Sequence, residues 1–286
     1  MRASASCSWA VLLLVGTLHA EPLSSRLVPL YQRMPAPRAG DWLSQHREPG
    51  QTLAEYKDEN KKLNGTVLYL QPVGAFTAAE ERIVADVEAA LAVFFQRPVK
   101  RLPSLPLPVR SLPKDSWRIN LATRQPQILT HTILDALVPR LPKDALGLIA
   151  LTATDLWPGG EWNYVFGEAA EDAPVGVWSL HRFGDPATGY DQVLLRAIKL
   201  ALHETGHMLG LRHCTAYRCG MNGTNNLQET DRCPLPFCPV CEEKLWWALG
   251  LDPQRRYEPL IAFAETHRME REATFWKAVR ERLRAR

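Results

Sequence analysis

The sequence of 286 residues lacks a long hydrophobic run, a stripe of basic residues and dispersed cysteines. Its longest apolar run, from Trp9 to Leu18, holds ten residues, well short of the ~20 that a membrane-spanning helix requires. The net charge is only +3, and the lysines and arginines do not gather as nucleic-acid binding requires. We therefore expect no stable membrane insertion and no nucleic-acid partner. The hydrophobic content of 46% does support a folded core.

The N-terminus has the layout of a signal peptide. Arg2 precedes the apolar run, and Ala20 offers a small residue at a cleavage point before Glu21. This layout predicts a cleaved leader over residues 1–20 and a secreted or periplasmic protein. The alternative is a disordered leader on a cytoplasmic protein. Cleavage would leave five of the six cysteines, because only Cys7 lies in the leader.

The rest of the chain has the patterns of one catalytic domain with extensions at both ends. Residues 21–62 are polar and without periodicity, which predicts a loosely packed N-terminal extension or a pro-segment. Residues 63–250 predict an α/β domain, and residues 251–286 a basic, amphipathic helical tail. A T-x-x-E capping box, Thr77 and Glu80, begins the first expected helix. The expected strands cover residues 65–74, 145–156, 162–169 and 175–183; the expected helices cover 77–97, 128–141, 191–209 and 241–250, and a proline-rich connector covers 98–113.

The stretch "HETGHMLGLRH", residues 203 to 213, has the residue types and spacing of a metal site. On a helix, His203 and His207 project from the same face one turn apart, within reach of one tetrahedral ion. Gly210 can adopt a positive φ at no steric cost, so it can end the helix and let His213 approach as a third ligand. This joint spacing favours a metal site over three unrelated core histidines.

The residue after the first histidine predicts the chemistry of the site. Three neutral imidazoles leave the fourth zinc position to water, and the metal lowers the pKa of that water towards neutrality. Glu204 is placed to act as general base on the zinc-bound water and then to carry the proton to the leaving amine. The pattern predicts zinc-dependent amide hydrolysis. His131 and His181 have no such partners, and we expect both to be structural or surface residues.

Five cysteines gather within the 28 residues from 214 to 241. Cys214 and Cys219 follow the third histidine, while Cys238 and Cys241 form "CPVC", a C-x-x-C turn of the kind that grips zinc from two sides. Four thiolates make a closed site, which predicts a structural zinc. The competing interpretation is one or two disulfides, which export would favour. Cys233 is left over and is expected to be a small buried apolar residue.

The run "HETGHMLGLRHC", followed by "TAYRC", "GM" and "CPVC", resembles the archaemetzincin family of zinc metalloproteases, a branch of the metzincins. The similarity extends from about Leu63 to Leu249 and includes "LTATDLW", "NYVFGEA" and "VWSLHRF". It implies an α/β (α+β) metzincin-like zincin with a mixed twisted sheet, an active-site helix and a small C-terminal part with a four-cysteine zinc site. The roles it implies are His203, His207 and His213 as catalytic zinc ligands, Glu204 as base, Met221 as the Met-turn residue, and Cys214, Cys219, Cys238 and Cys241 as structural zinc ligands.

These patterns together predict a zinc metallopeptidase with two zinc ions per chain and a peptide or protein substrate. An antiparallel edge strand within residues 163–169 is expected to hold an extended peptide by main-chain hydrogen bonds. One alternative is a non-catalytic, zinc-stabilised binding module, against which the intact Glu204 argues. Another is a thiol oxidoreductase, but no thioredoxin-like context precedes Cys238. The sequence specifies neither the cleavage specificity nor the oligomeric state.

Overall fold

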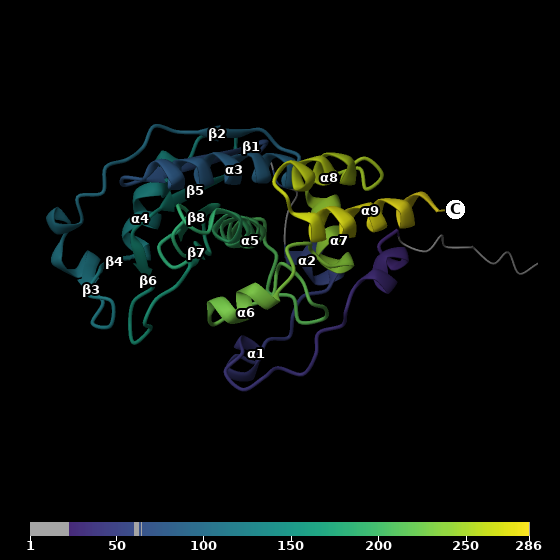
Figure 1. The fold of residues 1–286 in the computed structure, drawn as a ribbon, viewed down its shortest axis with the longest axis horizontal. Coiled ribbons are helices and arrows are strands. Elements are labelled where there is room, and N and C mark those ends of the chain that lie inside the picture. Colours follow the sequence, from purple (N-terminus) through teal and green to yellow (C-terminus); the bar gives the residue numbers. More distant parts are fainter. Residues whose placement is uncertain (1–22, 60–62, 64, 286) are drawn as a thin grey trace, which may run out of the picture.

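The computed structural model describes residues 23–59, 63 and 65–285, so the predicted signal peptide lies outside the described residues. The predicted mixed α/β class is confirmed: a twisted five-stranded sheet, in the order β2-β1-β5-β8-β7, forms the centre of the domain (Figure 1). Four strands run parallel, and the edge strand β7 runs antiparallel to β8. Their bounds are β1 Val67–Val73, β2 Val99–Arg101, β5 Ala145–Thr152, β7 Gly167–Ala169 and β8 Val175–Ser179.

A second, three-stranded sheet was not predicted. It has the order β3-β4-β6 and consists of β3 (Trp117–Ile119), β4 (Pro126–Leu129) and β6 (Asp155–Trp157). Strand β4 occupies the start of the segment predicted as a helix over 128–141, and the helix α4 spans only Thr130–Leu137. Strand β2 likewise lies in the stretch 98–113 predicted as a connector. Strands this short have too few residues to show an alternating pattern.

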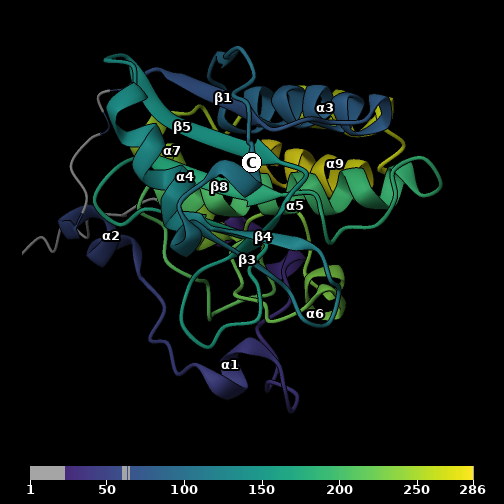
Figure 2. The same cartoon turned by 90° about the vertical axis from the view of Figure 1, so that its left-hand side faces the viewer.

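Helices cover both faces of the main sheet because successive side chains of a strand point to opposite faces. On one face, Leu68 and Leu70 of β1 share a core with α3 (Ala78–Phe95) and α5 (Tyr190–Met208). On the other face, Val67 and Tyr69 pack in the core that contains α4 (Figure 2). The predicted capping box at the start of α3 is present. Helix α5, which carries His203 and His207, packs against the sheet beside the edge strand.

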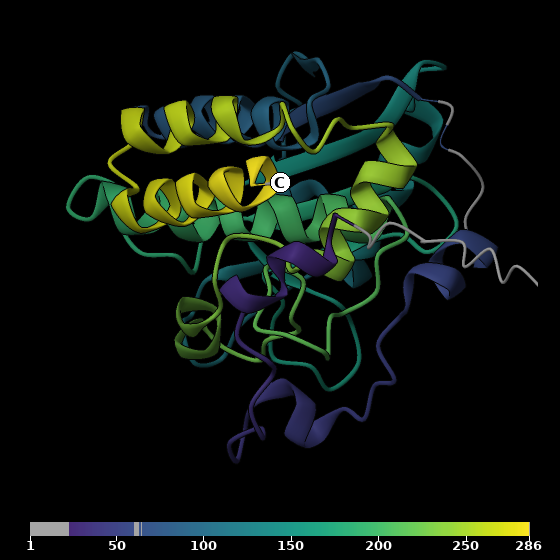
Figure 3. The same cartoon turned by 90° about the vertical axis from the view of Figure 1, so that its right-hand side faces the viewer.

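The C-terminal region consists of three helices rather than the two predicted. Helix α6 (Leu227–Arg232) precedes it, and α7 (Pro239–Leu249) ends at Gly250 with a φ of 62°, as predicted. The tail was predicted as a single helix, but α8 (Tyr257–Thr266) and α9 (Glu270–Arg284) lie side by side (Figure 3). Arg268, with a φ of 56°, reverses the chain between them. No helix in the described part of the chain is both long and apolar enough to cross a bilayer.

The N-terminal segment runs along one side of the domain and is attached to it at single residues, an attachment that the sequence did not predict (Figures 1 and 3). It contains η1 (Ser25–Leu30), α1 (Trp42–Gln45) and α2 (Leu53–Glu59). Leu27 and Tyr56 are fully buried, and the Tyr56 hydroxyl donates to the carbonyl oxygen of Leu209 at 2.7 Å. Single apolar anchors of this kind, separated by polar residues, leave no periodic signal in a sequence.

Candidate functional site

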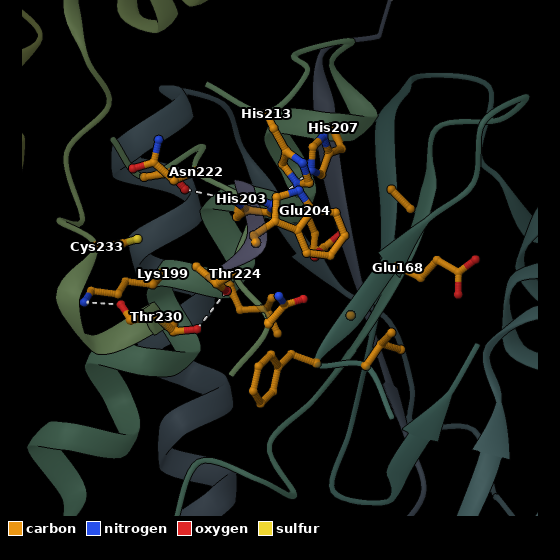
Figure 4. Close-up of a pocket in the computed structure, with 18 of the residues that line it drawn as sticks. Glu168, Lys199, His203, Glu204, His207, His213, Asn222, Thr224, Thr230 and Cys233 are labelled. Carbon is orange, nitrogen blue, oxygen red and sulfur yellow. Dashed lines mark hydrogen bonds between the residues drawn. The ribbon is translucent and has the colours of Figure 1, made fainter. Parts of the chain in front are cut away.

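The structure brings together the three histidines of residues 203 to 213. His203 and His207 lie on the last turns of α5, and Gly210, with a φ of 84°, turns the chain as predicted so that His213 returns towards them. The ring centroids are 4.5 to 5.3 Å apart. One ring nitrogen from each histidine lies within 4.8 Å of the other two, as a shared metal ion would require. Figure 4 shows the three rings pointing towards one common point.

The outer nitrogen of each ring has an acceptor, so the other nitrogen is left for a metal. An Nδ1–H that donates outward fixes the tautomer with a lone pair on Nε2. The Nε2 atoms of His203 and His207 are 2.9 Å apart, and two lone pairs at this distance repel unless a cation lies between them. This donor set fits zinc. The acceptors for Nδ1 are Gly220 O for His203 at 2.9 Å, Leu211 O for His207 at 2.7 Å, and Glu48 Oε1 for His213 at 2.9 Å.

Burial keeps two of these rings neutral. It lowers the pKa of His203 well below its usual value and lowers the pKa of His207 to about 4, and the neighbouring imidazoles lower both pKa values further. Zinc binds the neutral imidazole, so no proton has to be displaced from these ligands near neutral pH.

Glu204 lies next to the histidine cluster and is only 6% exposed. Burial, and then the charge of Glu168, raise its pKa to about 8; a cation held by the histidines would favour the ionised carboxylate. The edge strand passes beside it, since a Cβ built at Gly167 would lie 3.0 Å from Glu204 Cγ. Glu168 itself points away from the histidines (Figure 4), where it accepts a hydrogen bond from Thr130 and lies 3.6 Å from His131 Nε2.

A cavity of about 280 Å³ extends between the edge strand and α5. The three histidines and Glu204 line it, together with aromatic side chains from α1, from the segment before β7 and from the loop after β8. Beyond His203 it reaches Lys199, whose ammonium group donates to the carbonyl oxygen of Thr230 at 3.1 Å. A chain of several residues could therefore lie across the histidine cluster. The aromatic lining residues are Trp42, Trp162, Tyr164, Phe166 and Phe183.

The four cysteines predicted to bind the second zinc form a separate, buried cluster. The sulfurs of Cys214, Cys219, Cys238 and Cys241 lie within 4.8 Å of one another, and none of the described cysteines forms a disulfide. Cys238 occupies the N-cap position of α7, and the positive end of the helix dipole there favours a thiolate. Cys233 lies outside the cluster and lines the cavity instead. Burial raises the pKa of the Cys233 thiol to about 11.

The two clusters are joined through the backbone. His213 and Cys214 are adjacent in sequence, and the Cys214 N–H donates to the carbonyl oxygen of Met221 at 2.7 Å. Met221 is fully buried beneath α5, where the Met-turn residue was expected. A metal held by the cysteines would therefore stiffen the loop that carries the third histidine.

Two residues near the histidines were missed. Glu48 accepts the hydrogen bond from His213, and the Trp42 ring lies edge-on to the same imidazole with centroids 5.2 Å apart. Both belong to the polar N-terminal segment, where a single acid and a single tryptophan carry no motif. Only the path of the folded chain could have revealed them.

Comparisons of sequence and of structure with known proteins all find peptidases of the archaemetzincin type. The profile of Peptidase family M54 matches residues 143–246. Archaemetzincin-2 of Rattus norvegicus is 32% identical over 79% of this chain and 72% of the relative, and that of Homo sapiens is 31% identical over 86% and 76%. The crystal structure of archaemetzincin from Methanopyrus kandleri is 27% identical with a TM-score of 0.53, covering 67% of this chain and 99% of that one. The crystal structure of archaemetzincin from Archaeoglobus fulgidus, in complex with malonate, is 28% identical with a TM-score of 0.50. The match covers 62% of this chain and 99% of that one.

Fold, site and relatives together define a zinc metallopeptidase. The chain belongs to the archaemetzincin family. The family and the enzyme class predicted from residues 203 to 241 are thereby confirmed.

Proposed function

We propose that this protein hydrolyses peptide bonds at a zinc ion held by His203, His207 and His213, with Glu204 as general base. The observation that carries the proposal is the set of acceptors around the three rings. Each Nδ1 is satisfied from outside, so the Nε2 atoms converge beside the buried Glu204 carboxylate. A structural zinc site would gain nothing from a base at that position.

Glu204 and the zinc ion have different roles in the proposed reaction. Zinc, when bound, supplies a Lewis acid that polarises the scissile carbonyl and makes water more acidic. Glu204 accepts a proton from the attacking water at its carboxylate and then donates it to the nitrogen of the leaving amine. Its burial at 6% exposure keeps bulk water from competing for that proton.

The edge strand β7 is suited to align the substrate. The carbonyl oxygen of Phe166 and the N–H of Ala170 bond to β8, each at 2.9 Å. Because bonding groups alternate along an antiparallel strand, the backbone groups of Gly167 and Ala169 face the open edge. An extended peptide added there would pass directly beside Glu204. Val165, in the predicted range, lies before this edge and donates its N–H to Leu156 O at 3.2 Å.

A proline at the open edge tests this alignment. Ala169→Pro removes an outward N–H and should raise KM for peptides while the protein keeps its fold and its metal. An unchanged KM in a folded Ala169→Pro variant would show that the peptide is held elsewhere.

The buried cysteine cluster supports a second, structural zinc, which gives two ions per chain. Four thiols in one closed group leave no position for water or substrate.

For the whole chain we propose a leader over 1–20 and a secreted or periplasmic location, an extension over 21–62, a catalytic domain over 63–250 and a helical tail over 251–286. Mass spectrometry of the N-terminus after expression with the leader tests the cleavage point before Glu21.

The activity itself is tested with a mixed peptide library and mass-spectrometric detection of new termini. The zinc-loaded protein should cut, and Glu204→Gln, which keeps the shape of the side chain, should not. Glu161→Gln, at an exposed acid, is the matched control and should cut normally. Peptides retained without cleavage by both the parent protein and Glu204→Gln would favour a zinc-stabilised binding module instead.

A further inference from the structure

The third histidine has a partner of a different kind from the other two. His203 and His207 are oriented by neutral backbone carbonyls, whereas His213 Nδ1 lies 2.9 and 3.1 Å from the two carboxylate oxygens of Glu48. His213 is also the one ligand that stands on a loop rather than on α5. A carboxylate behind a ligating imidazole fixes its ring and raises its basicity.

Glu48 is itself held in place by a second hydrogen bond, to the same oxygen that lies nearest His213. The indole N–H of Trp42 donates to Glu48 Oε1 at 2.9 Å. The backbone N–H of Trp42 is in turn bound by Glu229 at 2.9 Å, which ties α1 to α6. The Glu48 carboxylate is thus oriented by a neighbour that is anchored to another element.

The segment after Glu48 clamps the loop that carries the third ligand. The side-chain amide of Gln51 donates to Gly210 O at 3.2 Å and its oxygen accepts from the Arg212 N–H at 3.3 Å. Lys244 of α7 donates to the backbone and side-chain oxygens of Gln51, at 2.6 and 3.0 Å. The turn between α5 and His213 is therefore fixed by residues 48–51.

We propose that Glu48 is a positioning residue for His213 and that the N-terminal segment is required for full zinc affinity at the histidine site. This inference rests on the zinc site of the proposed function. Its consequence is that residues 41–51 are not a removable inhibitory pro-segment, because the third ligand depends on them.

The contact geometry separates support from inhibition. An inhibitory segment would place a donor at the open position of the metal, on the Nε2 side of the rings. Glu48 contacts Nδ1, the nitrogen that faces away from the cluster. Among the residues that the structure describes, the group of converging donors contains the three histidines alone.

The test measures zinc affinity and needs no peptide cleavage. In the full chain, Glu48→Ala and Glu48→Gln are titrated with zinc against a chelator, and cobalt substitution distinguishes the histidine site from the cysteine site, since only thiolates give intense cobalt charge-transfer bands. Asp58→Asn, which removes the charge of an exposed side chain on α2, is the matched control.

We expect Glu48→Ala to weaken zinc binding at the histidine site about 10- to 100-fold, and Glu48→Gln less, because the amide oxygen still accepts the Nδ1–H. The cysteine site and Asp58→Asn should keep the parent affinity. Parent affinity in a folded Glu48→Ala protein, or an equal loss at both sites, overturns the proposal. If Glu48→Ala does not fold, Glu48→Gln decides by the same criteria. Tight zinc binding that depends on Glu48 without any peptide cleavage would refute the proposed function and leave this inference standing.

Discussion

The sulfur of Met221 lies against the backbone of Gly206, so closely that a Cβ built on Gly206 would be 2.5 Å from Met221 Sδ. Gly206 stands between the two helical histidines, His203 and His207, and Met221 is fully buried below them. The glycine is needed here for close approach and not for an unusual φ, because it lies inside α5. The turn of α5 between the two histidines therefore packs directly on the methionine.

Gly206→Ala should destabilise the protein by about 1–3 kcal/mol, the usual cost of overpacking, because buried Met221 has little room to move. Met221→Ala alone should cost about 2–5 kcal/mol through the cavity it leaves. The double variant should cost less than the sum, since each change relieves the defect of the other. Urea unfolding of the four proteins measures this coupling. Strictly additive costs would show that the two residues do not interact.

Serine substitution of Cys238 and of Cys233 tests which cysteines bind the proposed structural zinc. Cys238→Ser should lose one zinc per chain and much of its stability, because structural zinc contributes folding free energy. Cys233→Ser should keep the parent zinc content, since Cys233 lies outside the four-sulfur group. Metal analysis of the purified proteins, with circular dichroism as a check of the fold, gives the answer. Loss of zinc from Cys233→Ser would reassign the ligand.

The candidate site was predictable from the sequence where its geometry is local. His203 and His207 share a helix face, Gly210 sets the turn, and Cys238 and Cys241 form one C-x-x-C turn, so their spacing already determines their proximity. Glu48 was not predictable, because it lies 165 residues from its partner His213.

In the fold, too, local features were predictable and contacts between distant segments were not. Strand β1 and helix α3 were predictable because a buried apolar run and a capping box signal them. Strands β3, β4 and β6, with three or four residues each, are too short for a pattern. The reversal at Arg268 was missed because a non-glycine residue with positive φ has no sequence marker. What the sequence did not reveal depends on contacts between distant segments.

A chelator should remove metal from the two proposed sites in order, first from the histidine site. The histidine site opens to a cavity, whereas Cys219, Cys238 and Cys241 are at most 1% exposed. A chelator should therefore abolish cleavage while the circular dichroism spectrum is unchanged, and the cysteine cluster should resist thiol alkylation until the protein unfolds. Time-resolved alkylation followed by mass spectrometry checks the order. Alkylation of Cys238 at the rate of the loss of cleavage would contradict it.

A buried ion pair ties the C-terminal helices to the rest of the domain. Arg256, before α8, is 0% exposed, and its Nε donates to Glu242 Oε2 on α7 at 2.7 Å. Its Nη1 also donates to the carbonyl oxygen of Phe94 on α3. The indole N–H of Trp246 donates to the same Glu242 oxygen at 3.0 Å. The pair thus connects α3, α7 and α8 within the core.

Arg256→Met should lower the free energy of unfolding by about 3–5 kcal/mol, because it leaves Glu242 buried without its counter-ion. Replacing both partners, as Arg256→Met with Glu242→Leu, should recover most of that loss, since no charge then remains buried. Arg255→Met is the matched control: its side chain is 89% exposed and 3.5 Å from Asp252, so it should change stability by about 0–1 kcal/mol. Urea unfolding measures all three. A double variant as unstable as Arg256→Met would mean that the Phe94 carbonyl, not Glu242, is the partner whose loss destabilises the core.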